Sequence, residues 1–201
     1  MNLPCMYKSL LFGILLVPLF TQPTENVSPV DIVLCTKAHP CGKFPALVIT
    51  LLRERAADVA TIDGMMKAFY ETVSGPKGQP RDWDRDRTLY TPDLRFVSIK
   101  ERRTGRLTAL IFDHQTFAES SEPGFTKRGF YEKEIHRTVQ QFGHIAHVFS
   151  TYESREAPDG PPTARGINSI EMIFDGHRWW ITFAEWDEER PGQILPKEFL
   201  S

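Results

Sequence analysis

The sequence predicts an α+β fold in which N-terminal helices pack on a curved antiparallel sheet. Three observations lead to this prediction. Apolar residues recur with helical spacing between positions 59 and 73, strand-like segments fill most of residues 94–186, and turn signals separate these strands. With 201 residues, the chain is long enough for one domain with a substantial core.

Four segments divide the chain. Residues 1–22 hold the apolar run Leu10–Phe20, which is too short to span a bilayer, where about 20 apolar residues are needed, and fits a signal peptide. Residues 23–55 are a linker in which a short helix could form, residues 56–190 the folded domain and residues 191–201 a tail. We therefore expect an exported protein, periplasmic or secreted, without a stable membrane span. The alternatives are an uncleaved anchor, or a wrongly assigned start and a cytoplasmic protein.

The charge composition disfavours two classes of partner. The 24 basic and 26 acidic residues leave a formal net charge of -2. Such a chain has no strong positive field to attract nucleic acid, and it carries no polybasic membrane patch. Neither partner is therefore expected.

Three cysteines allow several interpretations. Cys5 lies in the expected signal peptide, which leaves Cys35 and Cys41 as a pair that could form a disulfide in an oxidising compartment. Two free thiols are the second interpretation. A metal site made of Cys35, His39 and Cys41 ranks third because it lacks a fourth ligand nearby. We expect neither a metal nor a cofactor.

The first element of the domain is a helix, whose apolar face recurs at intervals of three and four residues. Asp58 is its expected N-cap, and Ser74-Gly75-Pro76 ends it. The charged segment Asp82–Arg87 predicts a short helix with Trp83 facing inward. The apolar face comprises Val59, Ile62, Met66, Phe69 and Val73.

The middle of the domain predicts one hairpin, one helix and two long strands. Thr104-Gly105 joins the hairpin strands, and pairing Arg103 with Arg106 places Val97 and Ile99 on the face of Leu110 and Phe112. A short helix over residues 114–121, capped by Asp113, ends at Glu122-Pro123-Gly124. Residues 130–141 and 144–155 follow as strands.

The last hairpin carries the clearest local signal. Asp175-Gly176 predicts a two-residue turn that pairs Phe174 with His177. Because side chains alternate along a strand, this register defines the two faces. Trp180 and Trp186 fall on the outer face, where they predict an apolar patch and a homodimer. The core-facing set is Asn168, Ile170, Met172, Phe174, His177, Trp179, Ile181, Phe183 and Glu185.

Several segments resemble the NTF2-like superfamily, whose members include nuclear transport factor 2, ketosteroid isomerases, scytalone dehydratase and SnoaL-type polyketide cyclases. The matching segments are Phe69-Tyr70, Tyr90–Asp93 and Asp175–Ile181. Residues 142–153 and 165–170 look like bacterial members described only as nuclear-transport-factor-2 family or SnoaL-like proteins. The resemblance covers roughly residues 57–188 and implies a cystatin/NTF2-like cone with an apolar cavity.

Catalytic residues of ketosteroid isomerases do not carry over to this chain. Those enzymes use a helix tyrosine, a general-base aspartate on the first strand and a protonated aspartate on a late strand. The corresponding positions fall near Phe69, Ser98 and Ile170, none of which can transfer a proton in this way. Tyr70 could be a displaced donor or simply a core residue. Steroid isomerase activity is therefore not expected.

Two groups of residues could carry acid–base chemistry. Pairing Gln141 with His144 makes His136 and His147 diagonal neighbours on the face of Glu134, where they could act as a general base or bind a metal, or simply form a half-exposed strand face. Glu185 ends the apolar face beside Asn168. Burial would raise the pKa of its carboxyl, unless the strand end frays into solvent.

Three functions are compatible with these observations. The first is small-molecule binding in an apolar cavity. The second is a cofactor-free isomerase, dehydratase or cyclase-type enzyme, and the third is a protein-interaction or dimerisation module. Candidate catalytic residues are Glu185, His147 and His136, and candidate ligand-binding residues are Asn168, Glu134, Tyr70, Phe69, Trp83 and Phe183.

Overall fold

The computed structural model describes residues 33–34, 42–43, 54–101 and 104–200. The expected signal peptide and the pairing of Cys35 with Cys41 lie outside these residues. Two short strands, β1 (Val33–Leu34) and β2 (Gly42–Lys43), form an antiparallel ladder of their own. Within the described part of the chain, no helix combines the length and apolar character that a bilayer crossing requires.

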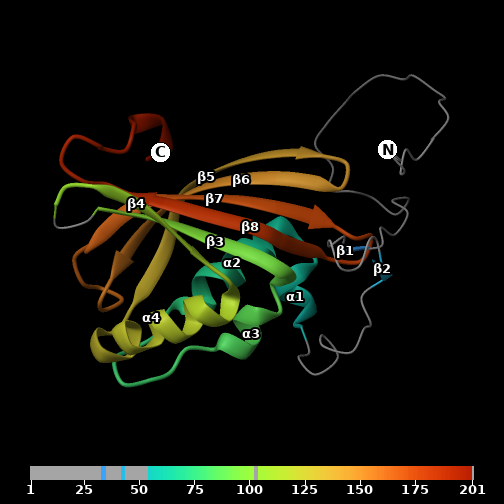
Figure 1. The fold of residues 1–201 in the computed structure, drawn as a ribbon, viewed down its shortest axis with the longest axis horizontal. Helices are drawn as coiled ribbons and strands as arrows, with labels where there is room; N and C mark the ends of the chain where they lie inside the picture. The colour runs from blue at the N-terminus through green and yellow to red at the C-terminus, as the bar shows by residue number, and fades with distance from the viewer. Residues whose placement is uncertain (1–32, 35–41, 44–53, 102–103, 201) are drawn as a thin grey trace, which may run out of the picture.

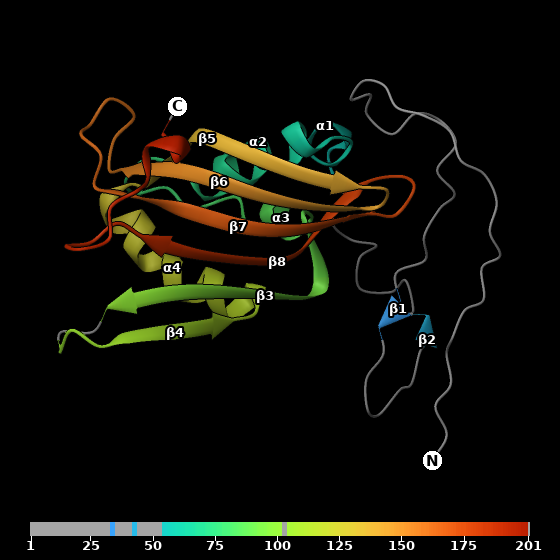
Figure 2. The same cartoon turned by 90° about the horizontal axis from the view of Figure 1, so that it is seen from above.

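Six strands form one curved sheet, and four helices cover its concave side (Figures 1 and 2). The sheet order is β4-β3-β8-β7-β6-β5, and every neighbouring pair is antiparallel except β3 and β8. This arrangement confirms the predicted α+β architecture. The helices are α1 (Ala56–Val59), α2 (Ile62–Val73), α3 (Trp83–Arg87) and α4 (His114–Arg128). The strands are β3 (Tyr90–Glu101), β4 (Leu107–Phe112), β5 (Tyr131–Phe142), β6 (Ile145–Arg155), β7 (Ala164–Phe174) and β8 (Trp179–Glu188).

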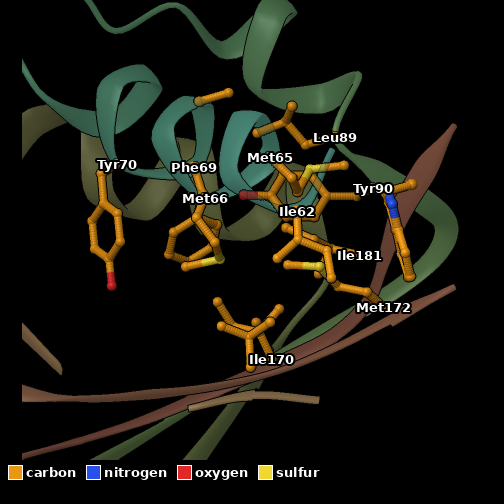
Figure 3. Close-up of a cluster of buried hydrophobic side chains, with 14 of the residues drawn as sticks. Ile62, Met65, Met66, Phe69, Tyr70, Leu89, Tyr90, Ile170, Met172 and Ile181 are labelled. Carbon is orange, nitrogen blue, oxygen red and sulfur yellow. The ribbon is translucent and has the colours of Figure 1, made fainter. Parts of the chain in front are cut away.

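The core lies between α2 and the middle of the sheet. Figure 3 shows side chains of α2 facing those of β7 and β8 across a single apolar layer. The predicted apolar face is therefore confirmed for its α2 part, since helical spacing alone places these residues on one side. Val59, expected in the same helix, is buried but lies in the separate helix α1. The contacting residues include Ile62, Met65, Met66 and Phe69 on the helix and Ile170, Met172 and Ile181 on the sheet.

The predicted N-cap of this helix is wrong. Thr61 caps α2 through its hydroxyl, which accepts a hydrogen bond from Gly64 N at 3.0 Å. The Asp58 carboxylate instead accepts two hydrogen bonds from the Arg85 guanidinium, with N–O distances of 2.7 and 2.8 Å. The hydrogen bond from Arg85 lowers the pKa of Asp58 and ties α1 to α3.

Helix α4 is longer than predicted. It begins at the expected Asp113 cap, where Thr116 N donates to the carboxylate at 2.8 Å, but it continues through Pro123 to Arg128. Phe117 and Phe125, eight residues apart, share one helix face, and their ring centroids lie 6.0 and 6.3 Å from that of Trp83. Tertiary packing on this face thus overrides the helix-breaking tendency of proline.

The β3–β4 register differs from the prediction by one residue. The last pair is Glu101 with Leu107, so the connection is longer than two residues. As a result Ser98, and not Val97 or Ile99, shares the concave face with Leu110.

The β7–β8 register also differs, for two reasons. Phe174 pairs with Trp179 across a four-residue turn, in which the Asp175 carboxylate accepts from His177 N and Arg178 N, each at 2.8 Å. A bulge opposite the Glu171–Met172 step then reverses the alternation along β8.

This reversal changes the faces of the residues at the end of β8. Phe183 and Glu185 lie on the convex face, and Trp186 lies on the concave face opposite Asn168. Trp180 is on the convex face but is buried beneath the Arg178 guanidinium, 3.7 Å from its ring centroid. The prediction that both tryptophans lie in one outer apolar patch is therefore wrong. The homodimer stays a prediction.

The β5–β6 pair contains a second bulge. Phe142 pairs with Ile145, and the register shifts between Glu134 and His136. This shift places Glu134 on the concave face and leaves both histidines on the convex face, His136 opposite Thr151 and His147 opposite Gln140. The predicted cluster of Glu134, His136 and His147 is therefore wrong.

Candidate functional site

A cavity of about 280 Å³ lies between the concave face of the sheet and helix α4, which crosses beneath β3 and β4 (Figure 1). Residues of α2 line one side of the cavity, and the concave face of the sheet lines another. Alternation along the strands dictates which side chains reach it. The lining residues are Phe69, Val73, Tyr90, Phe96, Ser98, Lys100, Leu110, Phe112, Phe117, Ser120, Ser121, Phe125, Phe130, Glu132, Tyr152, Ser154, Asn168, Trp186 and Glu188.

Aromatic rings make up much of the cavity wall, nine of the nineteen lining residues. Phe117 of α4 lies among them, with its ring centroid 4.7 Å from that of Phe96 and 5.7 Å from that of Trp186. These rings are held by packing against both the helix and the sheet. Most of the cavity therefore presents an apolar surface to a ligand.

The charged residues gather at one end of the cavity. Glu132 is the second residue of β5, Glu188 ends β8 and Lys100 lies near the end of β3. Lys100 Nζ forms an ion pair with Glu188 Oε1 at 2.9 Å. The Glu132 carboxyl has no hydrogen-bond or ion-pair partner among the described residues.

Glu132 is the most strongly perturbed acid in the cavity. Burial raises the pKa of its carboxyl to about 8, the charge of Glu188 adds to the shift, and Lys100 opposes it. Near neutral pH both the protonated and the ionised forms are therefore populated. A carboxyl group with such a pKa can either donate or accept a proton.

The Tyr152 side chain packs against a glycine on the neighbouring strand. It pairs with Gly166 of β7, and a Cβ atom on Gly166 would lie 2.7 Å from Tyr152 Oη and 2.3 Å from Asp187 O. Only glycine leaves room for the tyrosine ring at this position. Burial, followed by the charge of Glu132, raises the pKa of Tyr152, so the phenol stays neutral.

Ser98 and Asn168 are two of the further polar side chains that line the cavity. The Ser98 hydroxyl is buried and has no hydrogen-bond partner in the described part of the chain. Asn168 Nδ2 donates to Tyr70 Oη at 3.1 Å, and Tyr70 Oη lies 2.7 Å from Ser150 Oγ, which in turn donates to Glu134. This chain of hydrogen bonds ties α2 to three strands. Burial raises the pKa of Tyr70 and keeps it neutral.

A separate polar cluster is centred on Asp86 of α3, which is fully buried. Its carboxylate accepts hydrogen bonds from Thr72 Oγ1 at 2.6 Å, from Tyr90 Oη at 3.2 Å and from His114 Nε2 at 2.8 Å. Tyr90 lines the cavity, whereas neither Asp86 nor His114 does. His114 instead lines a shallow groove on the outer side of α3 and α4.

The residues chosen from the sequence are dispersed in the structure. Of these, Phe69 and Asn168 line the cavity, and Tyr70 and Glu134 lie next to it in the hydrogen-bonded chain. Trp83 does not line the cavity, but its ring packs against Phe117 and Phe125, which do. Its Nε1 donates to Glu122 at 2.8 Å. The residues on the convex face, away from the cavity, are Phe183, Glu185, His136 and His147.

The predicted placement of Glu185 in the cavity is therefore wrong. Its side chain is exposed and lies opposite Ser169, because the bulge in β8 turns this end of the strand over. His147 Nε2 is also held on the convex face, 3.1 Å from Ser169 Oγ.

Sequence reasoning missed the charged end of the cavity. Glu132 precedes Glu134 by two residues, and Lys100 follows Ser98 by two. The period of two along a strand places each pair on one face, so this signal was present in the sequence. This spacing identifies the charged end of the cavity only when the strand registers are known.

Across residues 54–101 and 104–200, no group of three or more His, Cys, Asp or Glu side chains is arranged to hold a metal ion.

The fold matches solved structures at low sequence identity. An NTF2-like protein of unknown function from Pseudomonas putida KT2440 has a TM-score of 0.51 and 14% identity, covering 72% of this chain and 96% of that one. An NTF-2-like protein of unknown function from Silicibacter pomeroyi DSS-3 has a TM-score of 0.46 and 13% identity over 65% of this chain and 94% of its own. A protein of unknown function with a cystatin-like fold from Nostoc punctiforme PCC 73102 has 0.49 and 10%, over 64% and 88% respectively.

The chain has the NTF2-like fold that its sequence resembles. No protein-family model matches the sequence, and a comparison with curated proteins finds no match. At this level of identity the likeness concerns the fold alone, since one fold hosts many chemistries.

Proposed function

We propose that the chain binds a small, largely apolar molecule in the cavity between α4 and the concave face of the sheet. The observation that carries this proposal is an aromatic-walled cavity with its charged groups at one end. This is the usual composition of a small-molecule site, in which apolar walls contribute affinity and a few polar groups orient the ligand. The volume of about 280 Å³ limits the ligand to a compact molecule.

A blocked cavity provides the test. Ser121→Trp on α4 would place a large ring in the cavity, and Gln115→Trp, at an exposed position of the same helix, is the matched control. Fragments that bind the parent protein in protein-observed NMR should lose affinity at least tenfold in Ser121→Trp and keep it in the control. Fragments that bind both variants equally would argue against the cavity as the site.

Catalysis is a second candidate function, favoured by Glu132. A carboxyl with a pKa of about 8 in an apolar cavity could serve as the acid or base of a cofactor-free isomerase, dehydratase or cyclase-type enzyme. Tyr152, a neutral phenol on the neighbouring strand, could donate a hydrogen bond to the same ligand. For any substrate found, Glu132→Gln should abolish turnover while binding persists. Unchanged turnover in this variant would exclude Glu132 from the chemistry.

A homodimer is a separate proposal. Edge strand β4 exposes two apolar side chains, Ile111 at 67% and Leu107 at 48%. Large exposed apolar side chains that lie together often mark contact surfaces. Sedimentation equilibrium over a range of concentrations tests this proposal, and a monomer at every concentration would overturn it.

A further inference from the structure

The charged end of the cavity carries more negative than positive groups. Two carboxyls, of Glu132 and Glu188, face one ammonium, that of Lys100. The Lys100 ammonium is already paired with Glu188 at 2.9 Å. If Glu132 ionises, its charge is therefore left without a partner among the described residues. Because Glu132 is half-buried, leaving it uncompensated is costly, and a cation in the cavity would remove this cost.

Each of these carboxyls has an aromatic ring beside it on the same face. Phe130 precedes Glu132 by two residues, and Trp186 precedes Glu188 by two along β8. On β6, Tyr152 precedes Ser154, which pairs with Glu132. All of these side chains line the cavity. The period of two thus places an aromatic ring and a polar side chain together on β6 and on β8, and Phe130, just before β5, takes the same position relative to Glu132.

Aromatic faces and carboxylates favour the same kind of ligand group. The face of an aromatic ring carries partial negative charge and attracts cations, most strongly when water is excluded. Several rings around a carboxylate are the usual means of binding an alkylated ammonium group. An anionic ligand would face two carboxyls and one lysine that is already paired, and a neutral ligand would offer no compensating charge to an ionised Glu132.

We propose that the ligand is an apolar ammonium cation, whose charged head lies between Glu132 and Glu188 among the rings of Phe130, Tyr152 and Trp186. This inference rests on the proposed binding function and specifies the chemical class of the ligand. The apolar body of the cation extends toward Phe96 and Phe117, where the wall carries no charge.

Binding of such a cation is coupled to a proton. Burial holds part of Glu132 in its protonated form near neutral pH, and a cation at this position requires the ionised form. The cation therefore displaces a proton, and its affinity rises with pH. The other titratable groups that face Glu132 from neighbouring elements are Glu188, Lys100, Tyr70, Tyr90 and Tyr152.

The first experiment compares three probes of one shape on the full chain by calorimetry at neutral pH. Cyclohexylmethylamine is a cation, cyclohexylmethanol is neutral and cyclohexanecarboxylate is an anion. The amine should bind roughly tenfold tighter than the alcohol, and the carboxylate should bind weakest. Glu132→Gln should abolish the preference for the amine. Glu101→Gln is the matched control, because it removes the same charge from an exposed residue at the end of β3 that does not line the cavity.

The second experiment uses benzyltrimethylammonium, whose charge does not depend on pH. Its affinity for the parent protein should rise roughly tenfold or more between about pH 6 and pH 9. The same titration of Glu132→Gln should give a flat profile.

The outcomes separate this inference from the binding proposal. If the alcohol or the carboxylate binds as tightly as the amine, or if the preference survives Glu132→Gln, the cation inference is overturned and cavity binding stands. A pH-independent affinity of benzyltrimethylammonium for the parent protein also overturns it. If none of the probes and no fragment binds, the binding proposal is overturned as well.

Discussion

Asp86 and Glu132 place carboxyl groups on opposite sides of the same aromatic wall, and their surroundings differ. Asp86 is fully buried and accepts three hydrogen bonds, from Thr72, Tyr90 and His114. Glu132 faces the cavity and has no partner in the described part of the chain, and its pKa is raised to about 8. The charge of Asp86 is used to hold α2, α3, β3 and α4 together. The Glu132 carboxyl makes no such contacts in the described part of the chain, so it is available to interact with a ligand.

The largest effect should follow from removing the paired carboxylate. Asp86→Ala would leave three buried donors without an acceptor, and we expect it to lower the free energy of unfolding by about 3–5 kcal/mol. Urea unfolding at neutral pH measures this. Asp84→Ala, an exposed position on the same helix, is the control and should change stability by less than about 0.5 kcal/mol. Equal losses in the two variants would show that the Asp86 cluster does not stabilise the fold.

A smaller loss should follow from disturbing the wall beside the unpaired carboxyl. In Gly166→Ala the new methyl group would overlap Tyr152 Oη and Asp187 O, and we expect a loss of about 2–3 kcal/mol. Gly124→Ala on α4 meets no atom within 4 Å and should instead stabilise by about 0.5–1 kcal/mol, as helix propensity favours alanine. Both values come from denaturant unfolding. A neutral Gly166→Ala would mean that Tyr152 does not need this glycine.

Glu132 should destabilise the fold progressively as the pH rises from about 5 to about 8. Its pKa rises from 4.5 to about 8 on folding, so between these values the folded state binds more protons than the unfolded state and stability falls as pH rises. Glu132→Gln should match the parent near pH 5 and be more stable by about 2 kcal/mol near pH 9, a figure reduced for partial solvent access. Unfolding free energies measured across this range test the prediction. A difference that does not change with pH would contradict the raised pKa.

The smallest effect concerns two hydroxyls on the two sides of the wall. Ser98 is buried without a partner among the described residues, so Ser98→Ala should change stability by less than about 0.5 kcal/mol. Thr72 donates to Asp86 at 2.6 Å, and Thr72→Val should cost about 1.5–2 kcal/mol because the acceptor is charged. Thermal and denaturant unfolding distinguish these values. If Ser98→Ala and Thr72→Val lowered the free energy of unfolding equally, the proposed difference between the unpaired and the paired hydroxyl would be wrong.

Local patterns in the sequence predicted those parts of the fold that depend on neighbouring residues. The spacing of Ile62, Met66 and Phe69 places them on one face of α2, and Asp113 caps α4 as expected. The inward set on β7, from Asn168 to Phe174, is likewise correct, since alternation holds within one strand whatever its partner.

The cavity depended on pairings that no local pattern specifies. The bulges in β5 and β8 each add one residue to one strand, and every side chain beyond them changes face. Glu134 and Trp186 moved to the concave side in this way, and Phe183 and Glu185 moved to the convex side. The charged end of the cavity became recognisable only once these registers were known.

The sequence by itself thus determined the helices, the strands and their apolar faces, because periods of 3.6 and 2 follow from the geometry of each element alone. Tertiary structure decided which carboxyl is paired and which is not. Asp86 meets Thr72 and His114 across 14 and 28 residues of chain. Glu132 lies near Glu188 only because the sheet curves. Such distances depend on how the strands pair and bend, and these properties arise from the packing of the whole domain.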